Sequence, residues 1–478
     1  MNYSMIRYTF GWLLLFESIF FAVPIITAAV YLESAFFAFL ITDLITLAFG
    51  ILLTRKKPTD KSLYAREGFL IVSVSWITIS FFGALPLFFS GSCQSFIDAL
   101  FESVSGFTTT GASIFSDVES LPRSILMWRS FTHWVGGMGV LVFIMAFLPL
   151  SGGQNMHIMR AESPGPEVSK LVPRVKNTAI ILYIIYFVMT LIMFISLLCS
   201  GMSVFDSVNT AFATAGTGGF GIYNDSFASF SATQQIIATV FMLLFAINFN
   251  SYYLVLKLKL RDAFNHEVRA FLAIVAIATT IIVINVAPSF ESTGDAVRHS
   301  AFTVASIISS TGFSTADFNL WPELSKTVLV ILMFIGACAG STGGGIKVSR
   351  IIILMKGMAR ELSMLIHPRQ VKKITIDSRP VEHEVIRSVN AYIATFILIF
   401  VSSLIVISFD NRDLITNFTA VTTTMNNIGP GLGGVGPTSN FQSFGALSKL
   451  VLIFDMLAGR LELFPMLVLF SPSTYKKT

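Results

Sequence analysis

The segment FESVSGFTTTGAS, residues 101–113, decides the fold, because three later segments share its texture. In each case an acidic residue comes first, a short apolar run follows, and the chain then continues with Thr, Ser and Gly. The later segments read SVNTAFATAGTGGFG (207–221), SIISSTGFST (306–315) and TTTMNNIGPGLGG (422–434). The acidic residues Asp98, Asp206, Asp295 and Asp413 precede the candidate glycines Gly111, Gly219, Gly312 and Gly429 by 13, 13, 17 and 16 residues. Recurrence of this kind indicates an internal repeat.

The composition places the chain in a membrane. Of its 478 residues 54% are hydrophobic and 12% are charged, about half the charged fraction of a soluble globular chain. About 20 apolar residues are needed to span a bilayer, and the first span is too long for a signal peptide. The ten candidate spans are 10–30, 34–54, 68–90, 126–150, 178–200, 233–256, 268–288, 325–355, 388–410 and 446–471. The cysteines Cys93, Cys199 and Cys338 are too far apart to indicate a disulfide framework or a metal cluster.

Lysine and arginine gather on one side of these spans. Of the 32 basic residues, 25 fall near the two termini, in loops 55–67, 151–177 and 257–269, and in segment 347–387. Six fall on the other side, and Arg460 lies within the last span. Because loops rich in Lys and Arg stay in the cytoplasm, both termini are predicted to be cytoplasmic. The net charge of +5 is not gathered on one polar domain, so no nucleic-acid partner is expected.

The four repeated segments fit the loops of a cation pore. Irregular backbone is tolerated at membrane depth only where it lines water or is buried in protein. Backbone carbonyls can replace the hydration shell of a cation, and glycine allows them to turn toward an axis. We expect the acidic residue to cap the short helix before each loop and the C-terminal end of that helix to favour a cation. The alternative of ordinary extracellular loops does not explain four occurrences at equivalent places.

On these motifs the chain resembles the superfamily of Trk, Ktr and HKT potassium and sodium transporters over essentially its whole length. Two helices before the repeats make it most similar to the TrkH branch. The resemblance implies an all-α membrane protein in which four pseudo-symmetric units, each a helix, pore helix, filter loop and helix, surround one central pore. The expected divisions are 1–64 (two extra helices), 65–155, 170–265 and 266–365 (units one to three) and 380–478 (unit four).

The resemblance also implies the filter residues and the ion. Carried over to this sequence, the filter is formed by Thr110 and Gly111, Gly218 and Gly219, Thr311 and Gly312, and Ile428 and Gly429. In the second loop GTGGF leaves either glycine possible, and Gly219 is favoured because Gly219-Phe220 matches Gly312-Phe313. Sodium-selective relatives often carry serine at the first filter glycine, so Gly111 implies a preference for potassium. The fourth loop, NNIGPG, departs from the pattern and indicates imperfect fourfold symmetry.

The resemblance also implies a gate below the filter. The strip GACAGSTGGGIK, residues 336–347, holds Gly336, Gly340, Gly343, Gly344, Gly345 and Lys347, and so many glycines cannot sustain a helix. A phosphate loop fits poorly, since Ile346 separates Gly345 from Lys347. A glycine strip that serves helix packing alone is a second alternative, which the sequence does not exclude. The resemblance places Arg460 in the pore, with a buried pair to Asp455 or Glu462 as the alternative. His133 is expected to be a structural histidine without a site role.

The remaining implications concern partners. The basic segment 356–387 either anchors the chain to the cytoplasmic membrane surface or, as the resemblance suggests, docks a separate cytosolic nucleotide-binding ring. The resemblance also suggests a homodimer in a bacterial inner membrane. No cofactor bound by this chain is expected, and potassium is the transported ion.

Two other classes of function compete with gated potassium uptake. A secondary transporter coupled to Na⁺ or H⁺, such as a potassium symporter or a carrier of another solute, also contains broken helices, often in inverted repeats. The repeats here run parallel, which favours the channel-like interpretation. An enzyme is not expected, because the sequence holds no metalloprotease or nucleophile motif.

Overall fold

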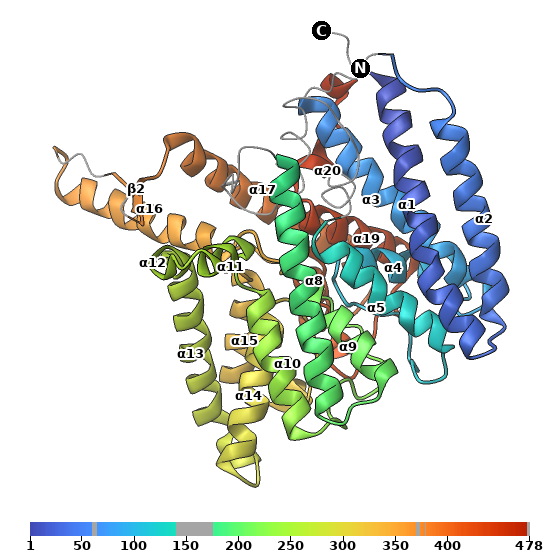
Figure 1. The fold of residues 1–478 in the computed structure, drawn as a ribbon. Coiled ribbons are helices and arrows are strands. Elements are labelled where there is room, and N and C mark those ends of the chain that lie inside the picture. The colour runs from blue at the N-terminus through green and yellow to red at the C-terminus, as the bar shows by residue number, and fades with distance from the viewer. Residues whose placement is uncertain (60–64, 140–174, 370–372, 378, 476–478) are drawn as a thin grey trace.

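The computed structural model describes residues 1–59, 65–139, 175–369, 373–377 and 379–475. Within them the regular secondary structure is helical except for a hairpin of two-residue strands, in which Thr375 pairs with Pro380 and Ile376 with Arg379. Figure 1 shows the two termini at the same end of the molecule. Large apolar side chains such as Ile19, Phe37 and Leu398 are exposed on the outer helices, as expected of surfaces that face lipid.

The same order of elements recurs four times after an initial helix pair. The pair is α1 (Tyr3–Val30) and α2 (Ala35–Thr54). Unit one comprises α3 (Ala65–Phe89), α4 (Phe96–Phe107) and α5 (Arg123–Gly137), and unit two comprises α8 (Val175–Cys199), α9 (Val204–Ala215), α10 (Ala232–Phe245), α11 (Phe249–Leu256) and α12 (Leu260–Ala263). Unit three comprises α13 (His266–Val286), α14 (Thr293–Ile308), α15 (Glu323–Ile335), α16 (Val348–Ile366), β1 (Thr375–Ile376) and β2 (Arg379–Pro380). Unit four comprises α17 (His383–Ile407), α18 (Leu414–Met425), α19 (Ala446–Arg460) and α20 (Phe464–Val468).

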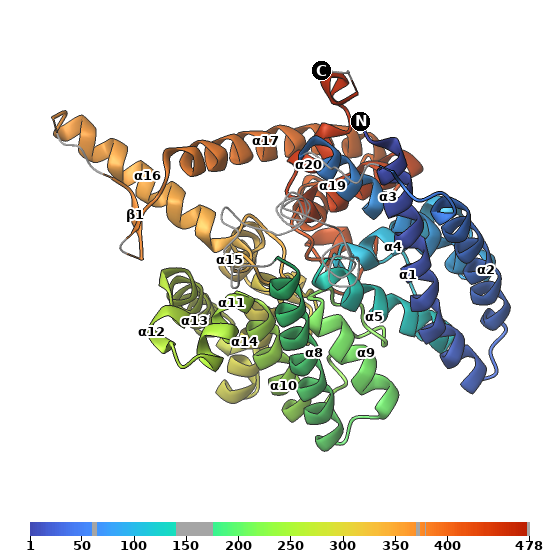
Figure 2. The same ribbon diagram turned by 45° about the horizontal axis from the view of Figure 1, so that its top comes forward.

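Units three and four also contain short 3₁₀ turns. They are Ala287–Ser289, Phe318–Leu320, Ser408–Asp410, Gly433–Val435 and Pro472–Thr474. Figure 2 shows the units arranged in chain order around a common centre, with α1 and α2 at the edge beside unit one. The largest cluster of buried apolar side chains joins α1, α3, α4 and α5 to α17, α18, α19 and α20. The first and last units therefore share a core, and the succession of units closes on itself.

The sequence predicts ten spans with one break, at 336–347; the second helix of units two and four is broken as well. Among the described residues six helices are long and apolar enough to cross a membrane, or seven if α10 and α11 count as one bent span. Those two helices meet at 91°, where Asn248 accepts a hydrogen bond from the backbone N–H of Asn250. The predicted span 325–355 is divided by the strip 336–347, and the span 446–471 by left-handed Glu462 and Leu463. Residues 140–150 of the fourth predicted span lie outside the described residues.

The breaks position the candidate site. The helix that follows each glycine-containing loop ends after 13 to 15 residues: α5 at Gly137, α10 at Phe245, α15 at Ile335 and α19 at Arg460. Hydropathy does not detect these breaks, because the residues on both sides are apolar. The backbone and side chains at the ends of these helices can therefore contact the four glycine-containing loops.

Candidate functional site

Four short helices, α4, α9, α14 and α18, carry the repeated loops, and their N-termini differ from the prediction. In α4, α9 and α14 the cap is a serine, whose side chain accepts a backbone N–H, and the predicted aspartate lies three residues later. Only α18 begins with the predicted acidic cap, Asp413. The serine caps are Ser95, Ser203 and Ser292. Serine fits this position as well as aspartate does, and the acidic residue in the first turn complements the helix dipole.

The corrected caps reveal a regular spacing. The candidate glycine follows the cap by 16 residues in loops 1, 2 and 4 (95 to 111, 203 to 219 and 413 to 429). In loop 3 the distance is 20 residues (292 to 312), because α14 has 16 residues where each of the other short helices has 12. One additional helical turn therefore explains the irregular spacing seen in the sequence.

All four short helices end in the same Schellman motif. In unit one the N–H of Thr109 donates to the carbonyl of Gly106, and the N–H of Thr110 donates to that of Ser105. The equivalent pair of bonds recurs in each other unit. The left-handed residue of this motif is Thr109, Thr217, Ser310 and Asn427 in loops 1 to 4. Glycine is usual at this position, so three Ser or Thr residues with positive φ mark strained backbone.

The shared motif fixes the register of the loops, which we define as residues 108–113, 216–221, 309–314 and 426–431. Two residues after the left-handed residue, each loop has a glycine that is also left-handed, with φ between 76° and 95°. These glycines are Gly111, Gly219, Gly312 and Gly429. Thr110, Gly218, Thr311 and Ile428 lie between the two left-handed positions and do not have positive φ. Gly219, and not Gly218, is thus equivalent to Gly111.

The four glycines and the four residues before them form a closed ring. A Cβ atom on Gly111 would lie 1.9 Å from the carbonyl oxygen of Gly218. The corresponding distances are 1.7 Å from Gly219 to the oxygen of Thr311, 2.2 Å from Gly312 to that of Ile428 and 2.8 Å from Gly429 to that of Thr110. Each loop therefore packs its glycine against a peptide oxygen of the next loop, and the fourth loop returns to the first. A side chain at these positions has no space.

Hydrogen bonds tie each loop to its neighbour as well. The side chain of Arg129 links units one and two by donating to the carbonyl of Gly221 (3.2 Å). Backbone joins units two and three, from Phe227 N to Ser314 O (2.9 Å). The side chain of Asn427 joins units four and one by donating to Thr110 Oγ1 (2.9 Å). At the remaining corner, between units three and four, the Asn319 side chain accepts the N–H of Gly433 (3.0 Å). Different groups hold the corners, so the arrangement is fourfold in backbone but not in side chains.

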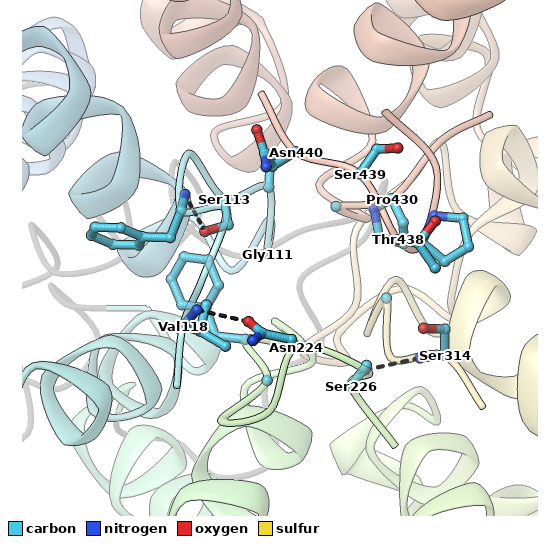
Figure 3. A pocket seen from close by; sticks show the side chains of 18 of the residues that line it. Gly111, Ser113, Val118, Asn224, Ser226, Ser314, Pro430, Thr438, Ser439 and Asn440 are labelled. Atoms are coloured by element: carbon cyan, nitrogen blue, oxygen red, sulfur yellow. Dashed lines mark hydrogen bonds between the residues drawn. The ribbon is translucent and has the colours of Figure 1, made fainter. Parts of the chain in front are cut away.

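A pocket opens on one side of the ring, lined by all four loops and by the chain that follows them. Figure 3 shows polar side chains directed into it from separate units, among them Ser113, Asn224, Ser314 and Asn440. Within the described part of the chain no carboxylate lines this pocket, and its charged member, Arg129, is bonded to Glu102 at 2.7 Å. The pocket therefore offers neutral oxygens to a cation.

The strip 336–347 lies on the other side of the ring, against loops 3 and 4. The N–H of Gly344 donates to the hydroxyl of Ser310 (2.6 Å). A Cβ on Gly344 would meet the carbonyl oxygen of Asn426 at 2.2 Å, and one on Gly343 would meet that of Ser309 at 2.8 Å. Glycine is needed here for the same reason as in the ring, which is close approach of backbone to backbone.

The strip is also bonded to the helices around it. Cys338 N donates to the carbonyl of Ala246 (3.1 Å), at the break of the bent pair. The carboxylate of Glu267 accepts the N–H groups of Ala339 (2.8 Å) and Ser349 (3.0 Å). Gly336, Gly340 and Gly345 have positive φ, as does Lys347, whose ammonium group donates to carbonyls of the strip itself. In this structure the strip is thus a folded loop with many backbone partners.

Arg460, at the end of α19, connects the strip with unit one. Its guanidinium donates to the carbonyl of Thr342 (2.9 Å), to that of Gly137 (2.7 Å) and to Thr109 Oγ1 (3.3 Å). The carboxylates considered as its partners from the sequence are engaged elsewhere: Glu462 pairs with Arg350, and Asp455 accepts from Ser403. The side chain of Arg460 therefore lies directly below loop 1.

Sequence reasoning missed several residues that hold the loops. The left-handed Thr, Ser and Asn residues carried a signal, since each lies two positions before the candidate glycine. Glu102 and Arg129 carried none, because they lie 27 residues apart in sequence and meet only when α4 packs on α5. His133, assigned no role, contacts loop 2.

Comparison with known proteins adds a family. A family described as TrkH, cation transport protein, matches residues 35–477. The Trk system potassium uptake protein TrkH of Halomonas elongata is 34% identical over 484 residues, which covers 100% of both chains. The protein of the same name from Escherichia coli K12 is 37% identical over 468 residues, 95% of each chain. The crystal structure of the potassium transporter TrkH from Vibrio parahaemolyticus has a TM-score of 0.89 and 32% identity, and the match covers 100% of both chains.

Proposed function

We propose that this chain, which belongs to the TrkH family of cation transport proteins, takes up potassium across the cytoplasmic membrane through the ring of four loops. The observation that carries the proposal is the closed contact of each loop glycine with a peptide oxygen of the next loop. Such a ring brings backbone oxygens from four segments to one axis without a fixed negative charge. Oxygens of this kind replace the hydration shell of a cation without holding the ion too tightly to leave.

The filter would consist of Thr110 and Gly111, Gly218 and Gly219, Thr311 and Gly312, and Ile428 and Gly429, with K⁺ bound by their carbonyls. Alternation of left-handed and other backbone conformations in each loop supports this role, because it turns successive carbonyls to the same side of the loop. The four short helices support it too. Their C-terminal ends stop at the loops, and the partial negative charge there stabilises a cation. Glycine at position 111 favours potassium over sodium.

The strip 336–347 and Arg460 would form the gate on the cytoplasmic side of the filter. This proposal is supported by the bonds that the strip makes to Ser310 and that Arg460 makes to both the strip and Thr109. A strip held by hydrogen bonds and glycine contacts can be released without unfolding a helix. The positive charge of Arg460 would oppose a cation that leaves the filter.

We further propose the arrangement of the chain in the cell. The units correspond to the predicted divisions 65–155, 170–265, 266–365 and 380–478 around one central pore, preceded by residues 1–64. Both termini and the basic segment 356–387 would be cytoplasmic, as the positive-inside rule requires. That segment would dock a separate nucleotide-binding ring and the chain would act as a homodimer. The exposed apolar side chains on α16, such as Met358 and Leu362, provide surface for such contacts.

Uptake of radioactive rubidium by purified protein in liposomes tests the function. Uptake driven by a potassium gradient alone, without another co-ion or an organic solute, is the expected result. An absolute requirement for Na⁺ or H⁺ would instead support the coupled transporter. Absence of any rubidium uptake, with folded protein present, would contradict the proposal. A nucleotide-dependent change in uptake after addition of the cytosolic ring tests the regulatory partner separately.

A further inference from the structure

The side chain of His133 lies behind loop 2 and contacts the backbone of both α4 and loop 2. Its Nδ1 is 2.8 Å from the carbonyl oxygen of Gly106 in α4, and its Nε2 is 3.2 Å from the backbone nitrogen of Phe220. A carbonyl only accepts and a backbone N–H only donates. The proton of the imidazole is therefore on Nδ1, and Nε2 accepts the N–H of Phe220. The neutral ring with this tautomer satisfies both partners.

The imidazole also takes the place of a side chain that loop 2 lacks. At the position between the two left-handed residues, the other loops have Thr110, Thr311 and Ile428, and loop 2 has Gly218. A Cβ on Gly218 would lie 2.2 Å from both Cγ and Nδ1 of His133. The ring therefore occupies the volume of the missing side chain, and it explains why this loop alone reads GTGG among the four.

A second buried group contacts the same segment. Arg129 lies one turn before His133 on α5, and its guanidinium is 4.1 Å from the ring of Phe220. The imidazole lies 4.3 Å from that ring, measured between centroids. The ring of Phe220 thus packs against both side chains, and Arg129 is fixed by Glu102. The backbone after Gly219 cannot shift without breaking these contacts.

We propose that His133 is a positioning residue for ion selectivity, which orients the carbonyl of Gly218 through its contacts with Gly218 and Phe220. This inference rests on the proposed function of the ring. The carbonyl of Gly218 is the oxygen that packs against Gly111, so the orientation set by His133 reaches the filter glycine of loop 1. Its role is specific to loop 2, because Thr110 and Thr311 are held by hydroxyls of their own loops, at 2.8 Å and 2.7 Å.

Two conservative variants separate the two hydrogen bonds. In His133→Gln the amide oxygen can reach the place of Nε2 and still accept from Phe220. In His133→Asn the amide nitrogen replaces Nδ1 and can still donate to Gly106, but the bond to Phe220 is lost. We expect the preference for K⁺ over Na⁺, measured by competition with rubidium uptake, to fall about tenfold in His133→Asn, the scale of one hydrogen bond. It should stay within about threefold of wild type in His133→Gln.

A compensating pair tests the volume argument. Gly218→Ala alone should lose selectivity, because the new Cβ collides with the imidazole. Gly218→Ala combined with His133→Ala removes the collision, so the pair should be more selective than the Gly218→Ala single variant, a coupling typical of residues in contact. His299 is a matched control, since it also packs on a phenylalanine, Phe290, and bonds Thr315 at 2.8 Å. His299→Asn should keep the wild-type ion preference.

The outcomes distinguish this inference from the proposed function. If wild type takes up no rubidium, the proposed function fails. If wild type is selective and His133→Asn has the same selectivity at equal uptake, the positioning role is refuted. Equal losses in His133→Gln and His133→Asn, without recovery in the double variant, would also refute it. Size-exclusion profiles of each variant in detergent identify any that fail to fold, and the double variant then decides.

Discussion

Replacing Gly111 with alanine would place a methyl carbon 1.9 Å from the carbonyl oxygen of Gly218, whereas Gly429→Ala would place one 2.8 Å from that of Thr110. Real Cβ atoms essentially never approach another heavy atom within 3.0 Å. Loop 2 must therefore move by about 1.1 Å in the first variant and loop 1 by about 0.2 Å in the second. Both positions have positive φ, so the backbone strain of about 1–2 kcal/mol is common to both.

The difference in K⁺ affinity between the two variants measures the effect of displacing the carbonyl of Gly218. A hydrogen bond to a charged group contributes about 1.5–3 kcal/mol, and we take an ion–carbonyl contact to be similar. Loss of one such contact lowers K⁺ affinity by roughly 10- to 100-fold, since each 1.4 kcal/mol is a factor of ten. Gly111→Ala should show this loss, and Gly429→Ala should lose less than about tenfold.

The assay is rubidium uptake by each purified variant in liposomes, with unlabelled K⁺ or Na⁺ as competitor and with protein amounts matched by size exclusion. Gly219→Ala (1.7 Å) and Gly312→Ala (2.2 Å) extend the series, so that the loss should follow the distance. Equal loss in Gly429→Ala and Gly111→Ala, or no loss in Gly111→Ala, would falsify the reasoning that the ring is closed by these contacts.

Three further predictions concern the gate and the helix ends. Arg460→Gln should raise rubidium flux by roughly 15-fold, because a charge about 10 Å away costs a cation roughly 1.7 kcal/mol at an effective dielectric constant of 20; unchanged flux at equal protein would refute a role for the charge. Ser310→Ala should raise basal flux, since the N–H of Gly344 loses its partner and the strip is destabilised by about 1–3 kcal/mol; lower or equal flux contradicts this. Ser203→Ala should reduce the free energy of unfolding by about 1 kcal/mol, measured by denaturant titration in detergent, whereas Ser196→Ala, at a half-buried serine whose hydroxyl donates to the carbonyl of Ile192 in its own helix, should change it little.

The family and the membrane class could be predicted from the sequence, and both are confirmed. The confirmed family is one of transport proteins, in agreement with the prediction that the chain is not an enzyme. Long helices such as α1, α8 and α17 were found because about 20 apolar residues have no other stable state in a bilayer. The break at 336–347 was predicted from its glycines, but the breaks in the second helices of units two and four were missed. At Asn248 a side chain replaces a helical hydrogen bond, and an average over an apolar window does not register one polar residue.

The candidate site could be located from the sequence, but the hydrogen-bond partners of its residues could not be predicted. The texture of the loops marks Gly111 and its equivalents, since only glycine fits where backbones touch. The partners of Arg460 could not be found, because Thr342 and Gly137 lie 118 and 323 residues away. The prediction of acidic caps was wrong for three of the short helices, because serine and aspartate three residues apart both suit the first turn.

The strip 336–347 belongs to unit three, yet it contacts loops 3 and 4. It is also bonded to Arg460, whose side chain reaches Thr109 of loop 1. An assembly of four identical subunits would carry four such strips, and each would claim the same space beneath the ring. Linking the units in a single polypeptide fixes the stoichiometry at one strip for each ring. Covalent continuity therefore permits an asymmetric closure that rotational symmetry forbids.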